Sequence, residues 1–190
     1  MKKILLKSFL LIIMLAFIIS SMTGCLVVEE MRFRFEFDNK DKDSGNFEIV
    51  YYGIKSSETE KNKIMEDYNR LLEKTTDEET ELKKYGLAMK EKEIKVEGKE
   101  KLCGHLRGTF LKKDIFNKEN AIFYESNEEI FLIGGIPKHN QFRSNGKLIE
   151  TEKNRIIVWP SSTQTLEWAI LYGSEEKPNN LTEIYLKDKK

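Results

Sequence analysis

The segment MRFRFEF, residues 31–37, alternates large apolar side chains with charged ones. Successive side chains of a β-strand point to opposite faces of a sheet, so this period of two predicts a strand with one buried aromatic face and one solvated charged face. The polar residues 38–46 include Ser44-Gly45 and are typical of a turn. Residues 47–52, FEIVYY, then form the returning strand of a predicted hairpin.

A helix is predicted directly after this hairpin. Apolar side chains recur at helical spacing over residues 58–74. Ser57 and Glu60 precede the apolar positions with the spacing of a capping box, in which each side chain bonds a backbone N–H of the first turn. We therefore expect the first helix to begin near residue 58.

A second, shorter helix is expected to begin at Thr76, because Thr76 and Glu79 repeat the capping-box spacing. Gly86 is a plausible stop, since glycine adopts the left-handed conformation that often ends a helix. The acidic cluster at residues 77–79 sits where carboxylates meet the positive end of the helix dipole. Helix capping explains this cluster better than metal binding does.

The remainder of the chain shows mostly strand patterns separated by turn signals such as Ser144-Asn145-Gly146. The predicted strands cover residues 94–96, 102–111, 121–124, 130–133, 147–150, 155–159, 165–172 and 184–186. A hairpin, two helices and then many strands predict an α+β fold, in which an antiparallel β-sheet of several strands has the two helices packed on one face.

The first 25 residues have the three zones of a secretory signal peptide. Lysines occupy positions 2, 3 and 7, an unbroken apolar run covers residues 9–19, and residues 20–25 are SSMTGC. A transmembrane helix needs about 20 apolar residues, so this run is too short to be one by itself. The pattern predicts a cleavable export leader.

The last four residues of this zone, Met22-Thr23-Gly24-Cys25, resemble the lipobox of bacterial lipoproteins. The resemblance implies a diacylglyceryl thioether on Cys25, with chains such as palmitate, and cleavage after Gly24. Residues 1–24 would then be the signal peptide and residues 25–190 a single extracytoplasmic domain, lipid-anchored to the cell membrane. The alternative is that Cys25 is incidental, with the leader either uncleaved or cut by an ordinary signal peptidase.

The composition excludes some function classes. From Cys25 onward the chain carries 29 basic and 32 acidic side chains, a net charge of about −3. This balance offers no basic footprint for nucleic acid. Cys25 and Cys103 are the only cysteines, so the sequence has no framework of disulfides.

No constellation in the sequence points to catalysis, a metal or a cofactor. His105 and His139 are the only histidines and lie far apart, whereas zinc sites usually need three or four ligands. Cys103 paired with His105 is a conceivable nucleophile and base, but a strand pair without a catalytic role is favoured. Gly134-Gly135 lacks the phosphate-binding patterns and is interpreted as a turn or bulge.

The mature chain is rich in aromatic residues on predicted strands. Most such side chains belong to a core. On a domain held at a bilayer, Phe33, Phe35, Trp159 and Trp168 are also candidates to line a pocket for a lipid ligand.

The order of motifs is similar to that of the LppM-like lipoprotein domain family. The likeness covers most of residues 25–173 and includes the lipobox cysteine, the aromatic hairpin, the helix pair and the strand with Gly104, Gly108 and Phe110. It ends with the segment from Gly146 to Trp168. The resemblance implies a small α+β domain on the outer membrane face that binds lipid or glycolipid, and it brings no catalytic residues.

The sequence therefore predicts a membrane-anchored, non-enzymatic binding or interaction domain, with a lipid or glycolipid as the first candidate ligand. The alternative is an envelope scaffold or assembly lipoprotein that binds a protein partner. An unrecognised hydrolase that uses Cys103, His105 or His139 is the remaining hypothesis.

Overall fold

The computed structural model describes residues 26–38, 43–73, 76–98, 100–116, 122–133, 140–151, 154–173 and 179–189. The predicted α+β class with mostly antiparallel strands is confirmed. Cys25, Gly134-Gly135 and His139 lie outside these residues, so the predictions made for them stay predictions.

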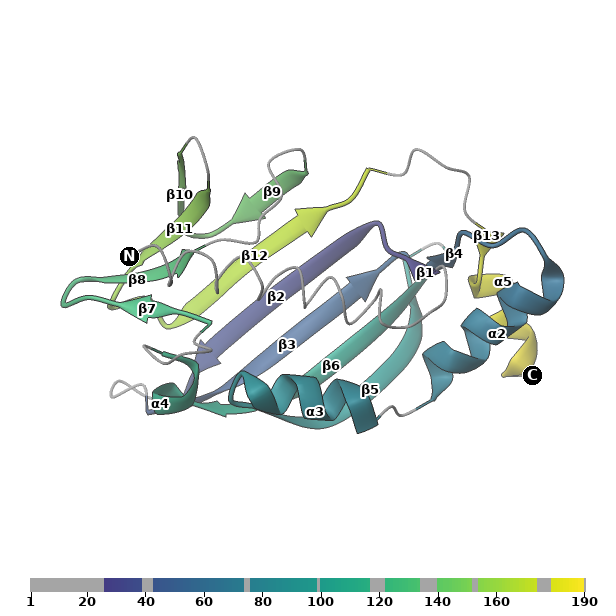
Figure 1. The fold of residues 1–190 in the computed structure, drawn as a ribbon, viewed down its shortest axis with the longest axis horizontal. Coiled ribbons are helices and arrows are strands. Elements are labelled where there is room, and N and C mark those ends of the chain that lie inside the picture. Colours follow the sequence, from purple (N-terminus) through teal and green to yellow (C-terminus); the bar gives the residue numbers. More distant parts are fainter. Residues whose placement is uncertain are drawn as a thin grey trace.

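A six-stranded antiparallel sheet forms the largest element (Figure 1). Its strands, in spatial order, are β5 (Leu87–Glu97), β6 (Lys101–Leu111), β3 (Ser44–Tyr52), β2 (Glu30–Phe37), β12 (Thr165–Leu171) and β9 (Gln141–Ser144). The predicted hairpin is confirmed, because β2 and β3 pair in antiparallel register with Phe33 opposite Ile49. On its other side β2 pairs with β12, a strand more than 100 residues later in the chain.

The prediction of one sheet was incomplete, because the described residues form two further sheets. The four-stranded one has the order β10 (Lys147–Glu150), β11 (Arg155–Pro160), β8 (Glu129–Ile133) and β7 (Tyr124–Glu125). The three-stranded one has the order β1 (Leu26–Val27), β4 (Lys55–Ser56) and β13 (Asn179–Asn180). These two sheets lie at opposite ends of the long strands (Figure 1).

The turn at Asn145-Gly146 carries the chain from one sheet to another. β9 before it belongs to the six-stranded sheet and β10 after it to the four-stranded sheet. The Asn145 side chain fixes the turn, because its Oδ1 accepts hydrogen bonds from Trp159 Nε1 at 2.7 Å and from the backbone N–H of Glu167 at 2.9 Å. The sequence signal identified the turn correctly but did not indicate that the strands on its two sides join different sheets.

Four helices occur in the described residues: α2 (Lys61–Leu72), α3 (Thr76–Lys84), α4 (Lys112–Ile115) and α5 (Thr182–Asp188). None of the helices in this part of the chain has the length and apolar character needed to cross a bilayer.

The capping box predicted at Ser57 is wrong. The preceding residue, Ser56, is buried instead, and its hydroxyl donates to Asp67 Oδ2 of α2 at 2.6 Å.

The second predicted helix begins at Thr76, as expected, and ends before Gly86. Gly86 has a φ of 77° and donates its N–H to the carbonyl of Lys83, which is the geometry of a glycine that ends a helix. Glu78 has a role that the capping interpretation missed. Its carboxylate is buried and forms an ion pair with Lys92 Nζ at 3.0 Å, which joins α3 to strand β5.

The strand predicted at residues 184–186 is wrong, because these residues belong to helix α5. Asn180 Oδ1 accepts the backbone N–H of Thr182 at 3.0 Å and satisfies a donor at the start of the helix. Leu181 is fully buried and ties this start to the body of the domain. Tertiary packing and local capping therefore override the strand preference of the isoleucine and tyrosine in this segment.

The core lies on one face of the six-stranded sheet, which we call the inner face. Met31, Phe33, Phe35 and Phe37 of β2 all point to this side and are at most 6% exposed. The main core cluster joins them to the four-stranded sheet and to the end of α3. A second cluster brings Leu26 of β1 together with residues of α2 and of the segment before α5.

Candidate functional site

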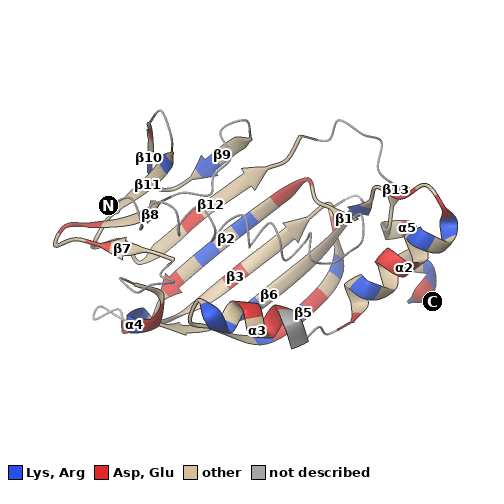
Figure 2. Cartoon of the chain, viewed as in Figure 1, with Lys and Arg blue, Asp and Glu red and all other residues tan. Residues whose placement is uncertain are grey.

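The opposite, outer face of the six-stranded sheet carries the charged half of the alternating pattern. Lys and Arg segments and Asp and Glu segments follow one another along its strands (Figure 2). Two rows of side chains cross this face in the observed register. The first row is Arg143, Ala169, Arg32, Val50 and His105, and the second contains Glu167, Arg34, Glu48 and Arg107.

These rows surround an open concavity of about 510 Å³. Its floor is low where the first row carries the small side chains of Val50 and Ala169, each 7% exposed. The longer side chains of the two rows stand around this floor. The volume falls in the range of roughly 300–1,000 Å³ that small-molecule sites occupy.

One wall of the concavity is cationic and is formed by Arg32, Arg34 and Arg143. Arg32 and Arg143 both bond the carboxylate of Glu30, and Arg34 bonds Glu167 at 2.8 Å. Arg143 has a 62% exposed side chain and Arg34 a 48% exposed one. These two guanidinium groups are thus accessible to a ligand although each has a carboxylate partner.

The other wall is acidic and is formed by Glu48 of β3 and Glu97 of β5 around the ring of His105. His105 Nδ1 lies 3.0 Å from Glu48 Oε1, and Nε2 lies 3.0 Å from Glu97 Oε1. Arg107 Nε also donates to Glu48 Oε1, at 2.8 Å. The guanidinium groups over β2 and β9 thus lie beside the carboxylates of Glu30 and Glu167, and the carboxylates over β3 and β5 lie beside His105 and Arg107.

Two nitrogens on this face are buried without a well-aligned hydrogen bond. One is Nε of Arg32, and the other is Nε2 of His105, whose close contact with Glu97 is not aligned for a hydrogen bond. The His105 side chain is only 6% exposed, so its ring is held firmly in the wall. Buried polar atoms normally have a protein or water partner, and a ligand oxygen at the floor can supply one to Arg32.

Two carboxylates of the site, those of Glu30 and Glu48, are held ionised. Burial on its own raises the pKa of Glu30, but the hydrogen bonds and charges of Arg32 and Arg143 outweigh it and leave the pKa below its ordinary value. Burial likewise raises the pKa of Glu48, and the bonds from His105 and Arg107 again lower it by more. The hydrogen bond to Glu48 is the main reason that the pKa of Arg107 lies above its ordinary value. Glu30 and Glu48 are therefore ionised at neutral pH.

The four aromatic residues proposed as ligand contacts lie in the core. Phe33, Phe35, Trp159 and Trp168 are between 1% and 6% exposed. The rings of Phe33 and Trp168 stack at a centroid distance of 4.8 Å, and Phe35 stacks on Trp168 at 5.6 Å. Phe33 and Trp168 also border the concavity from below. Their packing explains their burial without a ligand, and the structure does not test whether they bind one.

Cys103 and His105 share the outer side of β6 but have separate partners. The Cys103 thiol is fully buried and donates to the carbonyl of Lys101 at 3.4 Å. Burial raises the pKa of this thiol, so it does not resemble an activated nucleophile. In the described part of the chain, His, Cys, Asp and Glu side chains form no group of three or more that could hold a metal ion.

A second pocket lies on the inner face between the helices and the sheet. It is lined mainly by apolar side chains, among them Leu26, Tyr51 and Leu71, and has a volume of about 40 Å³. A cavity of about 150 Å³ binds a molecule the size of benzene, so this pocket is too small for an acyl chain. The buried pair of Glu78 and Lys92 closes one side of it.

The arginine and glutamate residues of the outer-face concavity were not singled out from the sequence. The signal was present in the charged half of the alternation at Arg32, Arg34 and Glu48, which was interpreted only as a solvated face. His105 was noted as a catalytic candidate, but its partners Glu48 and Glu97 come from strands that only the tertiary fold brings beside it.

Comparison with known proteins adds no identification. No protein-family model, no curated protein and no solved structure matches this chain. The resemblance to the LppM-like lipoprotein domain family and the lipobox assignment therefore remain predictions from the sequence.

Proposed function

We propose that this chain is a bacterial lipoprotein, held on the extracytoplasmic face of the cell membrane through lipid on Cys25, and that its folded part is a non-enzymatic binding domain. The leader, with its basic start, its apolar run over residues 9–19 and its lipobox-like end, supports the anchor. Two acyl chains give stable attachment to a bilayer, whereas one chain of myristoyl size gives only marginal binding.

The main support for a binding role is the concavity of about 510 Å³ on the outer face. The exposed guanidinium groups of Arg34 and Arg143 lie on one wall and the carboxylates of Glu48 and Glu97 on the other, and each wall also holds groups of opposite charge that pair with them. A ligand that bears both an anionic and a cationic group complements this arrangement, with its anion toward Arg32 and Arg143 and its cation toward Glu48 and Glu97.

The inner pocket of about 40 Å³ favours a polar ligand over a buried acyl chain. If the ligand is a lipid or glycolipid, its headgroup or sugar is the part that we expect to bind. The scaffold role is the second candidate, because the charged network continues beyond the concavity through Arg107 to Glu91 and Glu93 of β5. A charged surface of that extent suits a segment of a protein partner.

The proposal is tested by photo-crosslinking in cells that express the full chain with its own leader. A photoreactive amino acid replaces Glu167, at the edge of the concavity, or Glu150, on β10 of the four-stranded sheet. Glu150 is the matched control because its side chain is also exposed, at 58% against 43% for Glu167. We expect a reproducible adduct only from position 167.

The adduct's mass distinguishes the two candidates, because a headgroup or sugar adds little mass whereas a protein partner adds a band on a gel. The adduct should disappear when Arg143 is replaced by Glu on the same chain. Equal labelling from positions 167 and 150, in protein whose Cys25 is acylated, would contradict the outer-face site.

A further inference from the structure

Leu26, the residue after Cys25, is held firmly at one end of the molecule. Leu26 is only 8% exposed and pairs with Ser56 in the three-stranded sheet. It packs in the cluster that contains Tyr68 and Leu71 of α2. Since one residue spans at most about 3.6 Å of extended chain, a lipid on residue 25 is attached within a few ångströms of this end.

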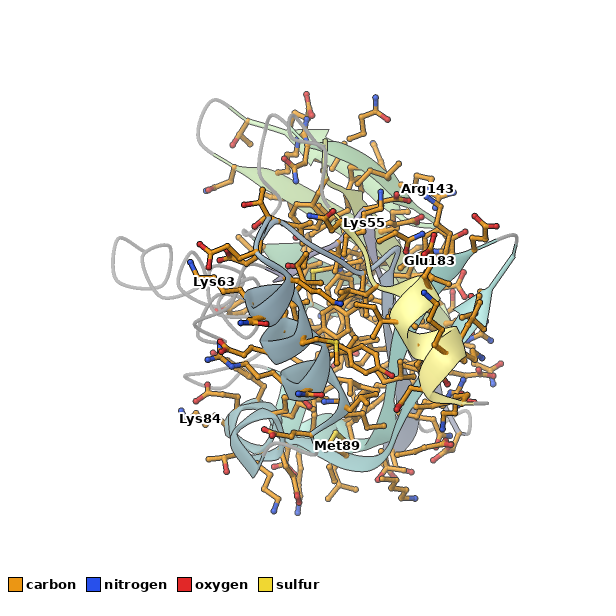
Figure 3. All side chains as sticks on the ribbon, turned by 90° about the vertical axis from the view of Figure 1, so that its right-hand side faces the viewer. Lys55, Lys63, Lys84, Met89, Arg143 and Glu183 are labelled. Carbon is orange, nitrogen blue, oxygen red and sulfur yellow. The ribbon has the colours of Figure 1, made fainter. Side chains whose placement is uncertain are left out.

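Helices α2 and α5 lie together at this same end (Figures 1 and 3). Figure 3 faces the end directly, with Lys63 labelled on α2 and Glu183 on α5. Helix α2 is tied to α5 by a hydrogen bond, because Tyr68 of α2 donates its hydroxyl to Asp188 of α5 at 3.0 Å. The two helices therefore lie together beside the point where the anchor begins.

Six large apolar side chains are exposed among the described residues, and three of them lie on α2 and α5. Met65 and Leu72 of α2 are each 39% exposed, and Leu186 of α5 is 46% exposed. Met65 and Leu72 are seven residues apart, which places them on the same side of the helix. That side lies directly beside the one with Tyr68 and Leu71, which are buried against the body of the domain.

The charge of the two helices does not oppose a phospholipid surface. Their exposed charged residues are balanced, with the cations Lys61, Lys63 and Lys187 and the acids Glu66, Glu183 and Asp188. Long basic side chains at a membrane surface keep their charge in the headgroup layer while their methylene stems cover apolar surface. Exposed Leu and Met beside such lysines suit the same layer.

We infer that the end formed by α2 and α5 rests directly on the phospholipid bilayer, with Met65, Leu72 and Leu186 at headgroup depth. The inference rests on the lipid anchor of the proposed function and adds an orientation to it. The four-stranded sheet is then the part farthest from the membrane, and the outer-face concavity opens to the side, where a ligand in the envelope reaches it without passing through the bilayer.

The orientation is tested with an environment-sensitive fluorophore on single introduced cysteines. The full chain, produced with its own leader in a Cys103→Ala background, carries Met65→Cys, Leu72→Cys or Leu186→Cys, and is placed in phosphatidylethanolamine–phosphatidylglycerol vesicles that contain a headgroup nitroxide lipid. Leu148→Cys is the matched control, because Leu148 is 36% exposed but lies on β10 in the four-stranded sheet.

We expect the nitroxide to quench the fluorophore at least twofold at the three helix positions and not at position 148. Equal quenching at all four positions, or quenching confined to position 148, in protein whose Cys25 is shown by mass spectrometry to be acylated, overturns the orientation and leaves the anchor intact. An unmodified Cys25 overturns the anchor and this orientation together, so the two failures are distinguishable.

Discussion

On the inner face of the six-stranded sheet, alternate side chains of β2, β3, β6 and β12 form a dry aromatic core, whereas on the outer face the intervening side chains form ion pairs around an open concavity. The same strands thus supply both faces. Burial of apolar area stabilises a fold by far more than exposed ion pairs do. The inner face therefore maintains the fold, and the charges of the outer face can serve binding at little cost to stability.

The two faces also use ion pairs differently. On the inner side, Lys92 and Glu78 form a pair with side chains only 7% and 10% exposed, and Lys92 also donates to the carbonyl of Glu73. On the outer face, Arg34 and its partner Glu36 are each nearly half exposed. Loss of one partner leaves a buried charge in the first case and a hydrated charge in the second, so the consequences should differ.

The largest effect on stability is expected from Phe35→Ala. The Phe35 ring is 2% exposed and packs against Phe110, Phe123 and Trp168. Such truncations cost about 3–5 kcal/mol, so urea denaturation should show a loss of this size in the free energy of unfolding. Glu36→Ala, one residue away on the outer face, is the control and should change it by less than about 1 kcal/mol. Similar losses for the two variants would refute the assignment of the faces.

Lys92→Met should destabilise the domain by about 3 kcal/mol, because it leaves the Glu78 carboxylate buried without a partner. The double variant Lys92→Met with Glu78→Leu removes both charges and should recover most of that loss in the same denaturation experiment. A double variant as unstable as the single one would show that the pair does more than neutralise Glu78.

A smaller effect is expected from pH on the outer-face carboxylates. The pKa values of Glu30 and Glu48 lie below the ordinary value of 4.5 in the folded chain, so their contribution is fully present above that value and is lost as the pH falls through the folded-state pKa. The free energy of unfolding should fall below about pH 4.5. Glu30→Gln should be less stable than the unmodified chain at pH 7 and lose less stability on acidification, so that the two curves converge. Parallel curves would contradict this assignment.

The smallest change in stability is expected from Arg143→Ala, since its side chain is 62% exposed. The buried carboxylate of Glu30 keeps Arg32 as a partner after this change, so denaturation should show a loss of at most about 1 kcal/mol. Binding should respond much more, because Arg143 forms part of the cationic wall of the concavity. Retained crosslinking at position 167 in this variant would remove Arg143 from the binding site.

The α+β class and most strands were predictable because they follow from local patterns. The alternation at residues 31–37 fixed the two faces of β2, and the helix spacing located α2 and α3 to within a few residues. Helix α5 and the sheet change at Asn145-Gly146 were not predictable, because they depend on burial of Leu181 and on hydrogen bonds of Asn145 that only the folded chain provides.

The candidate site was less predictable than the fold. Its residues come from six strands spread over more than 100 residues, and nothing in the separate segments indicates that Arg143 lies two strands from Arg32. Aromatic residues were predicted as ligand contacts because of their chemistry, but Phe35 and Trp159 are core residues. The charged residues between them form the accessible surface.

The most direct test of the outer face as the binding surface is an NMR experiment on the ¹⁵N-labelled, detergent-solubilised full chain. One spectrum contains the Nε–H signals of Arg32, Arg34 and Arg143 on the outer face and the backbone N–H signals of Leu82 and Tyr85, which pack in the inner core. On addition of unlabelled envelope extract from the cells that make the protein, we expect the arginine signals to shift, Arg32 above all, and the signals of Leu82 and Tyr85 to stay in place. Unchanged arginine signals beside shifted signals of Leu82 and Tyr85 would contradict the account.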